Sequence, residues 1–159
     1  MSDLAVRSAD TEPTELYIAF KVADVEYALP ASVVRQLESF TGATTVPGAP
    51  DFVAGIIQIR GRVVPVVDLR VRFGLPAAPA DETADRRVVV GENGDRAVAL
   101  LVDVAREVLK IAPSQLRAPP RILDEGRAGF VRALAHLGPR VVMVLDFQRV
   151  LGEELVDVG

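Results

Sequence analysis

The chain of 159 residues contains no cysteine and no tryptophan, and its only histidine is His136. Without cysteine the protein can form no disulfide, no thiolate nucleophile and no cysteine-ligated metal site. His136 lies in the alternating run RALAHLG, where we expect a structural or surface role rather than catalysis. The composition therefore predicts neither a metal site nor a cofactor.

Long apolar runs are also missing from the sequence. None approaches the roughly 20 residues that a membrane helix requires, and the N-terminal segment lacks the apolar centre of a signal peptide. The net charge is -4, which disfavours a nucleic-acid surface built from clustered lysine and arginine. We therefore expect a cytoplasmic protein that neither inserts directly into a membrane nor binds nucleic acid.

What the sequence does contain is the composition of a folded protein, with 50% apolar and 25% charged residues. Its length fits one domain that is large enough to bury a core. We place this domain at residues 15–155, after a flexible N-terminal tail at 1–14.

Most of the chain consists of short alternating runs broken by turn residues, a pattern typical of strands. A first hairpin is expected from strands at 16–22 and 25–30. A second is expected around an Asn93-Gly94 turn. Residues 104–111 also alternate, and their β-branched neighbours favour a strand. The sequence therefore predicts a mainly β fold.

One segment has a different period. Within residues 31–40, four apolar residues fall at the spacing of one helix face: Val33, Val34, Leu37 and Phe40. This spacing predicts a short helix directly after the first hairpin.

An internal repeat is the clearest feature of the sequence. The segment RVVPVVDLRVRFG at 62–74 aligns without a gap with RVVMVLDFQRVLG at 140–152, an offset of 78 residues between positions 62 and 140. Both segments begin with Arg-Val-Val, place an aspartate after the apolar run and end in glycine. The repeat predicts two similar β units of about 70 residues that share one core.

The repeated aspartates, Asp68 and Asp146, both follow an apolar strand. A carboxylate at that point can accept amide hydrogens at a helix N-terminus, which is the role of an N-cap. A single helical turn would follow, and the glycines Gly74 and Gly152 would end it in the left-handed conformation. We therefore predict that both aspartates are helix caps.

The hairpin before Asp68 has two unusual residues. Pro65 interrupts the apolar run at 63–67, and proline cannot donate to a ladder, so this strand should lie at an edge or carry a bulge at Pro65. The turn before it contains Arg60, Gly61 and Arg62. Arg60 is either an exposed turn cation or an arginine that faces a partner, and the composition does not separate these two roles.

The hairpin motif VAGIIQIRGRVVPVVDLRVRFGL closely resembles the core signature of the CheW-like domain of bacterial chemosensory adaptors. The resemblance continues through ELYIAFKVADVEYALPASVVRQLES, VALLVDVAREVLKI and VVMVLDFQRVLG, and so covers the chain from Glu15 to Leu155. It implies two SH3-like five-stranded β barrels packed as one unit, with a few short helices. The expected division is a first barrel mainly at 15–75, a linker at about 76–85, a second barrel mainly at 86–147 and a short helix at 147–151.

The resemblance also implies a function. A stand-alone protein of this kind is a non-enzymatic adaptor that couples the cytoplasmic tips of methyl-accepting chemoreceptors to the regulatory domain of a CheA-type histidine kinase. It would be recruited from the cytoplasm to chemoreceptor arrays. By position, the resemblance assigns the following residues to partner binding: Val34, Gln36, Gly55, Arg60, Ala99, Ala105 and Val108.

The sequence departs from the family pattern at several of these positions. Gln36 stands where an acidic residue that pairs with Arg60 is common, and Glu38 is a substitute only if the two positions share a face, which they would not on a helix. Ala99 and Ala105 replace the glycine and valine of some relatives, which points to a different receptor partner.

Two alternatives to an adaptor have weaker support. Asp68, Asp103 and Asp146 form a possible carboxylate cluster, but all three follow apolar strands and two are explained as caps, so acid–base catalysis is not expected. The GENG segment lacks the lysine and the strand-to-helix context of a phosphate-binding loop. A small oligonucleotide-binding barrel would need aromatic stacking platforms in a basic groove, and aromatics make up only 5% of the chain.

Overall fold

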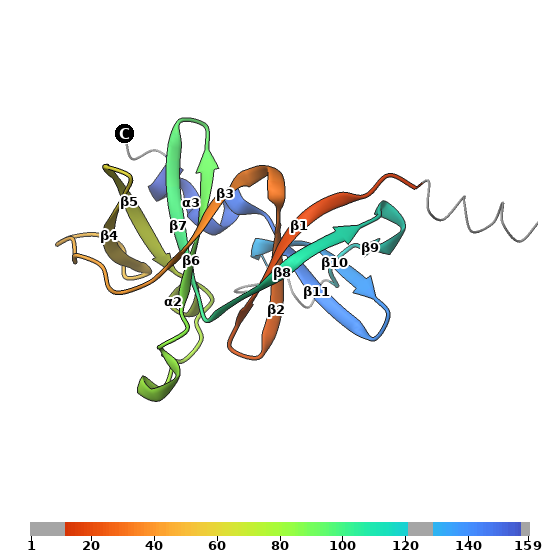
Figure 1. Ribbon diagram of the computed structural model, residues 1–159, viewed down its shortest axis with the longest axis horizontal. Coiled ribbons are helices and arrows are strands. Elements are labelled where there is room, and N and C mark those ends of the chain that lie inside the picture. Colours follow the sequence, from red (N-terminus) through yellow and green to blue (C-terminus); the bar gives the residue numbers. More distant parts are fainter. Residues whose placement is uncertain (1–11, 121–128, 157–159) are drawn as a thin grey trace, which may run out of the picture.

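The computed structural model describes residues 12–120 and 129–156, which form two β-sheets lying side by side (Figure 1). No helix in these two ranges is long and apolar enough to cross a membrane. In chain order the elements are β1 (Glu15–Val22), β2 (Val25–Pro30), η1 (Ala31–Val33), β3 (Val34–Ser39), β4 (Val53–Ile59), β5 (Arg62–Asp68), α2 (Leu69–Arg72), η2 (Ala80–Glu82), β6 (Arg87–Asn93), β7 (Arg96–Val102), β8 (Val104–Ile111), η3 (Pro113–Gln115), β9 (Leu116–Arg117), β10 (Val131–Leu137), β11 (Arg140–Leu145) and α3 (Phe147–Val156).

The predicted mainly β fold with two packed β units is confirmed, but the chain is divided between them differently. One sheet has six strands in the order β8-β1-β2-β11-β10-β9, and the other has five in the order β3-β6-β7-β5-β4. The first hairpin, at 15–30, therefore belongs with the C-terminal strands and not to a barrel at 15–75. Residues 76–85 connect two parts of the same five-stranded sheet, so they do not separate the two units.

Long-range parallel pairing accounts for this division. Met143 and Val144 of β11 pair in parallel with Tyr27 and Ala28 of β2, while β5 pairs in parallel with β7. Parallel neighbours cannot be joined by a tight turn, so they come from distant parts of the chain and leave no local sequence signal. The local antiparallel hairpins were predictable, whereas their grouping into sheets was not.

The predicted hairpins are present, although the second turn is formed by Gly94 and Asp95 between the paired residues Asn93 and Arg96, and not by Asn93 and Gly94. β1 and β2 pair in register from Tyr17–Pro30 to Val22–Val25, and β6 pairs with β7 up to Asn93–Arg96. Gly94 opens the second turn with a φ of 64°, a conformation that a primed hairpin turn needs and glycine adopts without steric cost. The strand predicted at 104–111 is β8.

Both aspartates of the repeat are helix N-caps, as predicted. Asp68 Oδ1 accepts the backbone N–H of Arg70 at 2.9 Å and of Val71 at 3.4 Å. Asp146 Oδ1 accepts the backbone N–H of Arg149 at 3.2 Å. The capped turns begin at Leu69 in α2 and at Phe147 in α3.

The two terminating glycines also behave as predicted. Gly74 and Gly152 have φ values of 72° and 75°, in the left-handed region. In α3 the residues from 147 to 151 form the predicted short helix, because the backbone at Gly152 is not helical and kinks the element there. The repeat thus marks two equivalent strand–cap–helix units.

The predicted helix at 31–40 is wrong. Only Ala31–Val33 form a 3₁₀ turn, and Val34–Ser39 form strand β3, paired with β6. The register shifts between Val34 and Gln36, where a bulge interrupts the pairing with β6. The extra residue accounts for the spacing of three between Val34 and Leu37. Leu37 is exposed and Phe40 packs on a different cluster from Val33 and Val34, so the four apolar residues do not share one buried face.

Pro65 is accommodated differently from the prediction. β5 lies between β4 and β7, so it is not an edge strand, and Pro65 pairs with Ile56 without a shift in register. The parallel pairing with β7 begins only at Val66, so the missing N–H interrupts no bond on that side. The bulge lies in β4 instead, between Val53 and Gly55.

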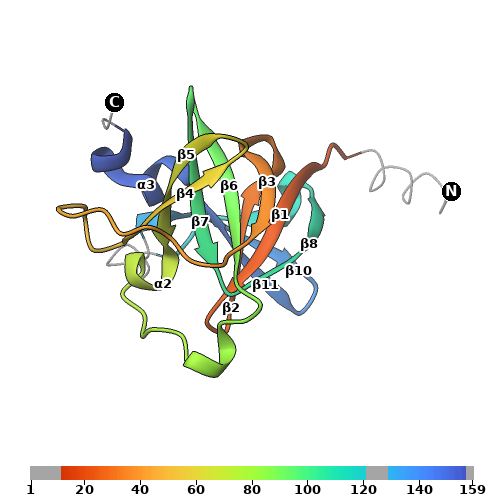
Figure 2. The ribbon, with the colours of Figure 1, turned by 60° about the vertical axis from the view of Figure 1, so that its left-hand side comes forward.

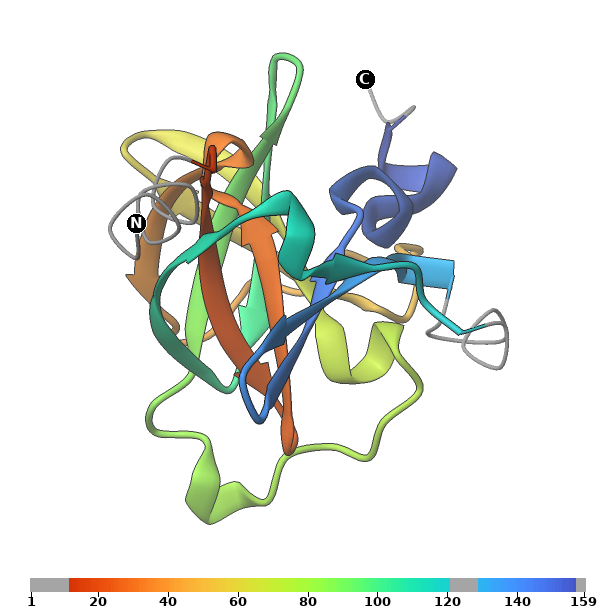
Figure 3. The same ribbon diagram turned by 90° about the vertical axis from the view of Figure 1, so that its right-hand side faces the viewer.

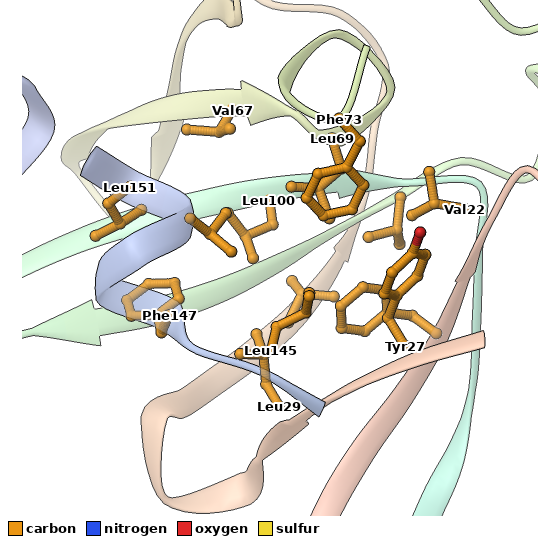
Figure 4. Packing of buried hydrophobic residues seen from close by; sticks show 14 of the residues in the cluster. Val22, Tyr27, Leu29, Val67, Leu69, Phe73, Leu100, Leu145, Phe147 and Leu151 are labelled. Carbon is orange, nitrogen blue, oxygen red and sulfur yellow. The ribbon is translucent and has the colours of Figure 1, made fainter. Parts of the chain in front are cut away.

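The largest core cluster lies between the two sheets and not inside either one. It contains buried side chains of β1, β2, β7, β11 and both α-helices, several of which are labelled in Figure 4. A chain of aromatic rings runs through it, with centroids 5.2 Å apart for Tyr27 and Phe73 and 5.4 Å for Phe73 and Phe130. Two smaller clusters fill the sheets themselves. Because the main core is shared, the two units form one body.

Two arginines of α2 tie the units together. Arg70 forms a bidentate ion pair with Asp103, with an Nη2–Oδ2 distance of 2.6 Å, and Asp103 also accepts the N–H of Ala23 in the first hairpin turn. The Arg72 guanidinium lies over the rings of Phe52 and Phe130, 4.1 and 4.9 Å from their centroids. These contacts explain why α2, a single turn, can hold a fixed position.

The tail predicted at 1–14 lies mostly outside the described residues. Glu12 is described, and its carboxylate accepts the backbone N–H of Ser114 at 3.0 Å and the hydroxyl of Ser114 at 2.8 Å. Glu12 therefore contacts the domain although it lies before the predicted boundary at residue 15.

Candidate partner-binding surface

The chain leaving β3 runs beside β4 and closes the five-stranded sheet, with Thr44 paired to Ile56 (Figure 2). An open groove lies at this seam. Its volume is about 820 Å³. The floor is formed by partly buried apolar side chains that also pack on the core of this sheet: Phe40, Ala43, Ile57 and Ile59. Glu38, Arg60 and Val63 are among the exposed residues at its rim.

Arg60 is an exposed residue of the β4–β5 turn, and it has a φ of 51°. This left-handed conformation is unusual for a residue other than glycine, asparagine or aspartate. Within the described part of the chain, no hydrogen bond or ion pair holds its guanidinium. Arg62, by contrast, donates to the carbonyl of Asp95 at 3.2 Å. Arg60 therefore presents a cation to the solvent beside an apolar groove.

Gln36 and Glu38 share one face of β3, because alternate residues of a strand point the same way. Gln36 Nε2 donates to Glu38 Oε1 at 2.7 Å. Glu38 lines the same groove as Arg60, although no ion pair joins the two among the contacts of the described residues. On a strand Gln36 and Glu38 share a face, which they would not on a helix. The acidic side chain of Glu38 therefore lies on the same face as Gln36 and lines the same groove as Arg60.

Val63 was not predicted as a surface residue. It belongs to an apolar run, yet 58% of the residue is exposed, and it lines the groove beside Arg60. Its neighbour Val64 is buried, because adjacent residues of a strand point to opposite faces. The available signal was that adjacent residues of a strand point to opposite faces. In an apolar run, a residue that points away from the core is therefore apolar although folding does not require it.

Gly55 has a structural role that accounts for its identity. Its φ is 148°, and a Cβ placed on it would lie 2.3 Å from the carbonyl oxygen of Thr44. Thr44 and Ile56 exchange two backbone hydrogen bonds there, at 2.8 and 2.9 Å, which closes the seam of the sheet. Gly55 is buried, so it shapes the groove from behind instead of contacting a partner with a side chain.

Val34, Ala99, Ala105 and Val108 do not lie in this groove. Val34 is half-buried against the shared core, and Ala99 of β7 is fully buried, which prevents its side chain from reaching a partner. Ala105 and Val108 lie on β8 in the other sheet. Of the seven residues assigned by resemblance, only Arg60 therefore lines the groove, while Ala105 and Val108 belong to a separate surface on β8.

The surface formed by β8 and the adjacent β1 has exposed apolar residues, Val108 and Leu16, beside charged residues. Val108 is 59% exposed and lies opposite Ile18 of β1, while Leu16 lies opposite Lys110. Next to Val108, Glu107 forms an ion pair with Arg140 at 2.9 Å. The hydrogen bonds of Arg140 with Glu26 and Glu107 raise the pKa of its guanidinium. These contacts fix the charges around an exposed valine.

The residues considered for catalysis are separated or already engaged. Asp103 is held by Arg70, Asp68 and Asp146 cap helices, and His136 is exposed on β10 opposite Val141. Among the described residues no three histidine, aspartate or glutamate side chains are grouped as metal ligands would be. None of the six phenylalanines and two tyrosines, all of which are described, is exposed as a stacking platform for nucleotides.

Comparisons with known proteins agree with this fold. The family model described as "CheW-like domain" matches residues 16–155. A probable chemotaxis protein CheW of Rhizobium etli is 30% identical over 149 residues, covering 94% of each chain. The chemotaxis protein CheW of Rhizobium meliloti is 31% identical and covers 86% of this chain and 87% of its own. The crystal structure of the scaffolding protein TtCheW from Thermoanaerobacter tengcongensis superposes with a TM-score of 0.80 at 24% identity, covering 90% of this chain and 91% of its own.

Proposed function

The chain belongs to the CheW-like domain family, and from this premise we propose that it is a chemotaxis adaptor that couples chemoreceptors to a CheA-type histidine kinase. It acts by contact, without chemistry of its own, in the cytoplasm at a receptor array. The relatives named above are chemotaxis proteins, and the protein of known structure is described as a scaffold.

The seam groove supports this proposal through one observation. It combines an apolar floor, the exposed Val63 and an arginine without a partner among the described residues. An isolated arginine beside apolar surface can form several hydrogen bonds with a carboxylate or carbonyl of another protein, in a planar arrangement. We assign the groove and Arg60 to contact with the kinase or receptor.

The size of the groove fits a transient contact. A small groove and a single exposed turn are consistent with an interface that buries about 1,200 Å² or less in total, the range of transient signalling encounters. The β8 surface around Val108 is a second contact region, on the other sheet. An adaptor needs two such regions to hold two partners together.

Isothermal titration calorimetry tests the proposal. The purified protein is titrated with the regulatory domain of the CheA-type kinase from the same organism, and separately with a receptor-tip fragment. We expect binding of modest affinity to at least one of them, weakened by Arg60→Ala and unchanged by Arg62→Ala. The absence of heat with both partners at high micromolar concentration would overturn the adaptor function.

A further inference from the structure

Asn93 is the only asparagine of the chain, and glycine follows it. The two residues lie at the tip of the β6–β7 hairpin, which projects beyond the body of the five-stranded sheet (Figures 1 and 3). Asn93 is partly exposed and Gly94 is exposed. In the fold this pair serves only to turn the chain, and the proposed adaptor function does not use it.

The contacts of Asn93 leave its amide group open to attack. Its side-chain oxygen Oδ1 accepts a hydrogen bond from Gln148 Nε2 at 3.2 Å. Among the described residues, no hydrogen bond engages its Nδ2 or the backbone nitrogen of Gly94. The carbonyl that would be attacked is therefore polarised by a donor, while the leaving group and the nucleophilic nitrogen are both unheld.

Gly94 also removes the usual steric protection. Gly94 has a φ of 64°, and no atom of the described structure lies within 4 Å of a Cβ built there. Because glycine has no Cβ, its backbone nitrogen can approach the side chain of Asn93. A bulkier residue at 94 would hinder that approach and would strain the turn.

We propose that Asn93 is a site of self-modification, which converts to aspartate and isoaspartate in the folded protein. The backbone nitrogen of Gly94 attacks Cγ of Asn93, and a C–N bond forms as the nitrogen loses its proton. The side-chain nitrogen leaves as ammonia, which gives a five-membered imide. One water molecule then opens the imide at either carbonyl, and no oxidant or reductant is required.

The product changes the electrostatics next to β3. One neutral amide becomes a carboxylate, so the net charge moves from -4 to -5. The new charge adjoins Glu92, which forms an ion pair with Arg35 at 3.1 Å, and Arg35 lies between Val34 and Gln36. The isoaspartate form also adds a methylene group to the backbone of the turn. The protein would thus carry a slow, irreversible change in charge beside β3.

Timed incubation at mildly alkaline pH tests this proposal. Trypsin cleaves after Arg87 and Arg96, so a peptide of residues 88–96 contains the single asparagine. We expect this peptide to gain the mass difference between an amide and an acid, and to split into two chromatographic forms. The intact protein should shift by one negative charge in isoelectric focusing. The folded protein and the chain unfolded in urea are compared at the same pH and temperature.

Three variants accompany the measurement. Asn93→Gln should abolish the shift and the second peptide form, and Gly94→Ala should slow both. Gln148→Ala should slow conversion in the folded protein but not in urea, and an unchanged rate would remove Gln148 from the mechanism. If the wild-type peptide stays unmodified in the folded protein while it converts in urea, the fold protects Asn93 and the proposal is wrong. A shift that persists in Asn93→Gln would be equally contradictory.

Discussion

The two repeats of the chain, β4–β5–α2 and β10–β11–α3, are related residue by residue. Their hairpins begin at Val53 and Val131 and keep the same offset of 78 residues throughout. Each has a bulge after its first residue, and each capping aspartate donates its own N–H to a phenylalanine carbonyl at 2.8 Å, Phe52 in one repeat and Phe130 in the other. What the two repeats share is therefore the fold itself.

Among the equivalent positions at which they differ, three pairs have a physical consequence that the structure shows. Gly55 corresponds to Ala133, and in the first repeat the Thr44 carbonyl lies where a Cβ of residue 55 would be. Arg72 corresponds to Val150. The Arg72 side chain donates a hydrogen bond to the Val150 carbonyl, which joins the two repeats. Arg60 corresponds to Gly138, and both have positive φ. The three differences have different roles: Gly55 lets the sheet close, Arg72 joins the units and Arg60 faces the solvent.

The largest effect is expected from making the first repeat resemble the second at Gly55. Gly55→Ala places a methyl group 2.3 Å from the Thr44 carbonyl oxygen and forces alanine to a φ of 148°. Strain and overpacking together should lower the free energy of unfolding by about 3 kcal/mol or more. Urea denaturation followed by circular dichroism measures this loss.

Gly42→Ala is the matched control for that variant. Gly42 has a φ of 125°, but nothing lies within 4 Å of its missing Cβ. The free energy of unfolding of this variant should fall only by the backbone strain of alanine at this φ, about 1–2 kcal/mol. Equal losses at the two positions would show that the approach of Thr44 contributes nothing.

The joint between the repeats should show the next largest effect. Arg72→Met keeps an apolar stem but removes the hydrogen bond to the Val150 carbonyl at 2.7 Å and the contacts with two aromatic rings. We expect a loss of about 2 kcal/mol in thermal or chemical denaturation. Arg149→Ala, whose side chain is 64% exposed, is the control and should change stability by about 0.5 kcal/mol or less. A similar loss in both variants would contradict a joint at Arg72.

The two caps should differ although their sequences match. Asp68 accepts two backbone amides and lies 3.7 Å from Arg86, while Asp146 accepts one amide and is more exposed. We expect Asp68→Ala to cost about 1–2 kcal/mol and Asp146→Ala about 0.5–1 kcal/mol. Denaturation curves of both variants measure the difference, and partner binding should persist while each remains folded. A folded variant that no longer binds would show that its carboxylate contacts a partner.

The extent of what the sequence could predict follows from the range of the interactions. The caps, the glycines and the hairpins depend on neighbouring residues, so the repeat was enough to place Asp68 and Asp146. The grouping of strands depends on parallel pairs between distant segments, such as Val144 with Ala28, which no local pattern records. The helix predicted at 31–40 was wrong because a bulge separates Val34 from Leu37 and because Leu37 and Phe40 do not join Val33 and Val34 on one buried face.

The candidate site divides in the same way. Arg60 was identifiable from its turn and from the family motif, and it does lie exposed at a groove. Ala99 was assigned by position alone, but its burial depends on how two sheets pack and was invisible in the sequence. Motifs thus located the turn, whereas only the packing showed which of the other positions reach the surface.

The smallest effect on stability, and the sharpest separation of fold from function, is expected at Arg60. Arg60→Gly gives the first repeat the residue that the second has at Gly138. Arginine at a φ of 51° carries left-handed strain of about 1–2 kcal/mol, while glycine loses about 0.5–1 kcal/mol more conformational entropy on folding. These terms nearly cancel, so the melting temperature should stay within a few degrees or rise, as for a change of about 1 kcal/mol or less. Kinase or receptor binding should nevertheless fall in calorimetry, because the planar cation is gone, while Arg62→Ala should bind normally. If Arg60→Gly binds as the wild type does, Arg60 does not contact a partner at this groove. The contact would then be assigned to the surface around Val108 on β8.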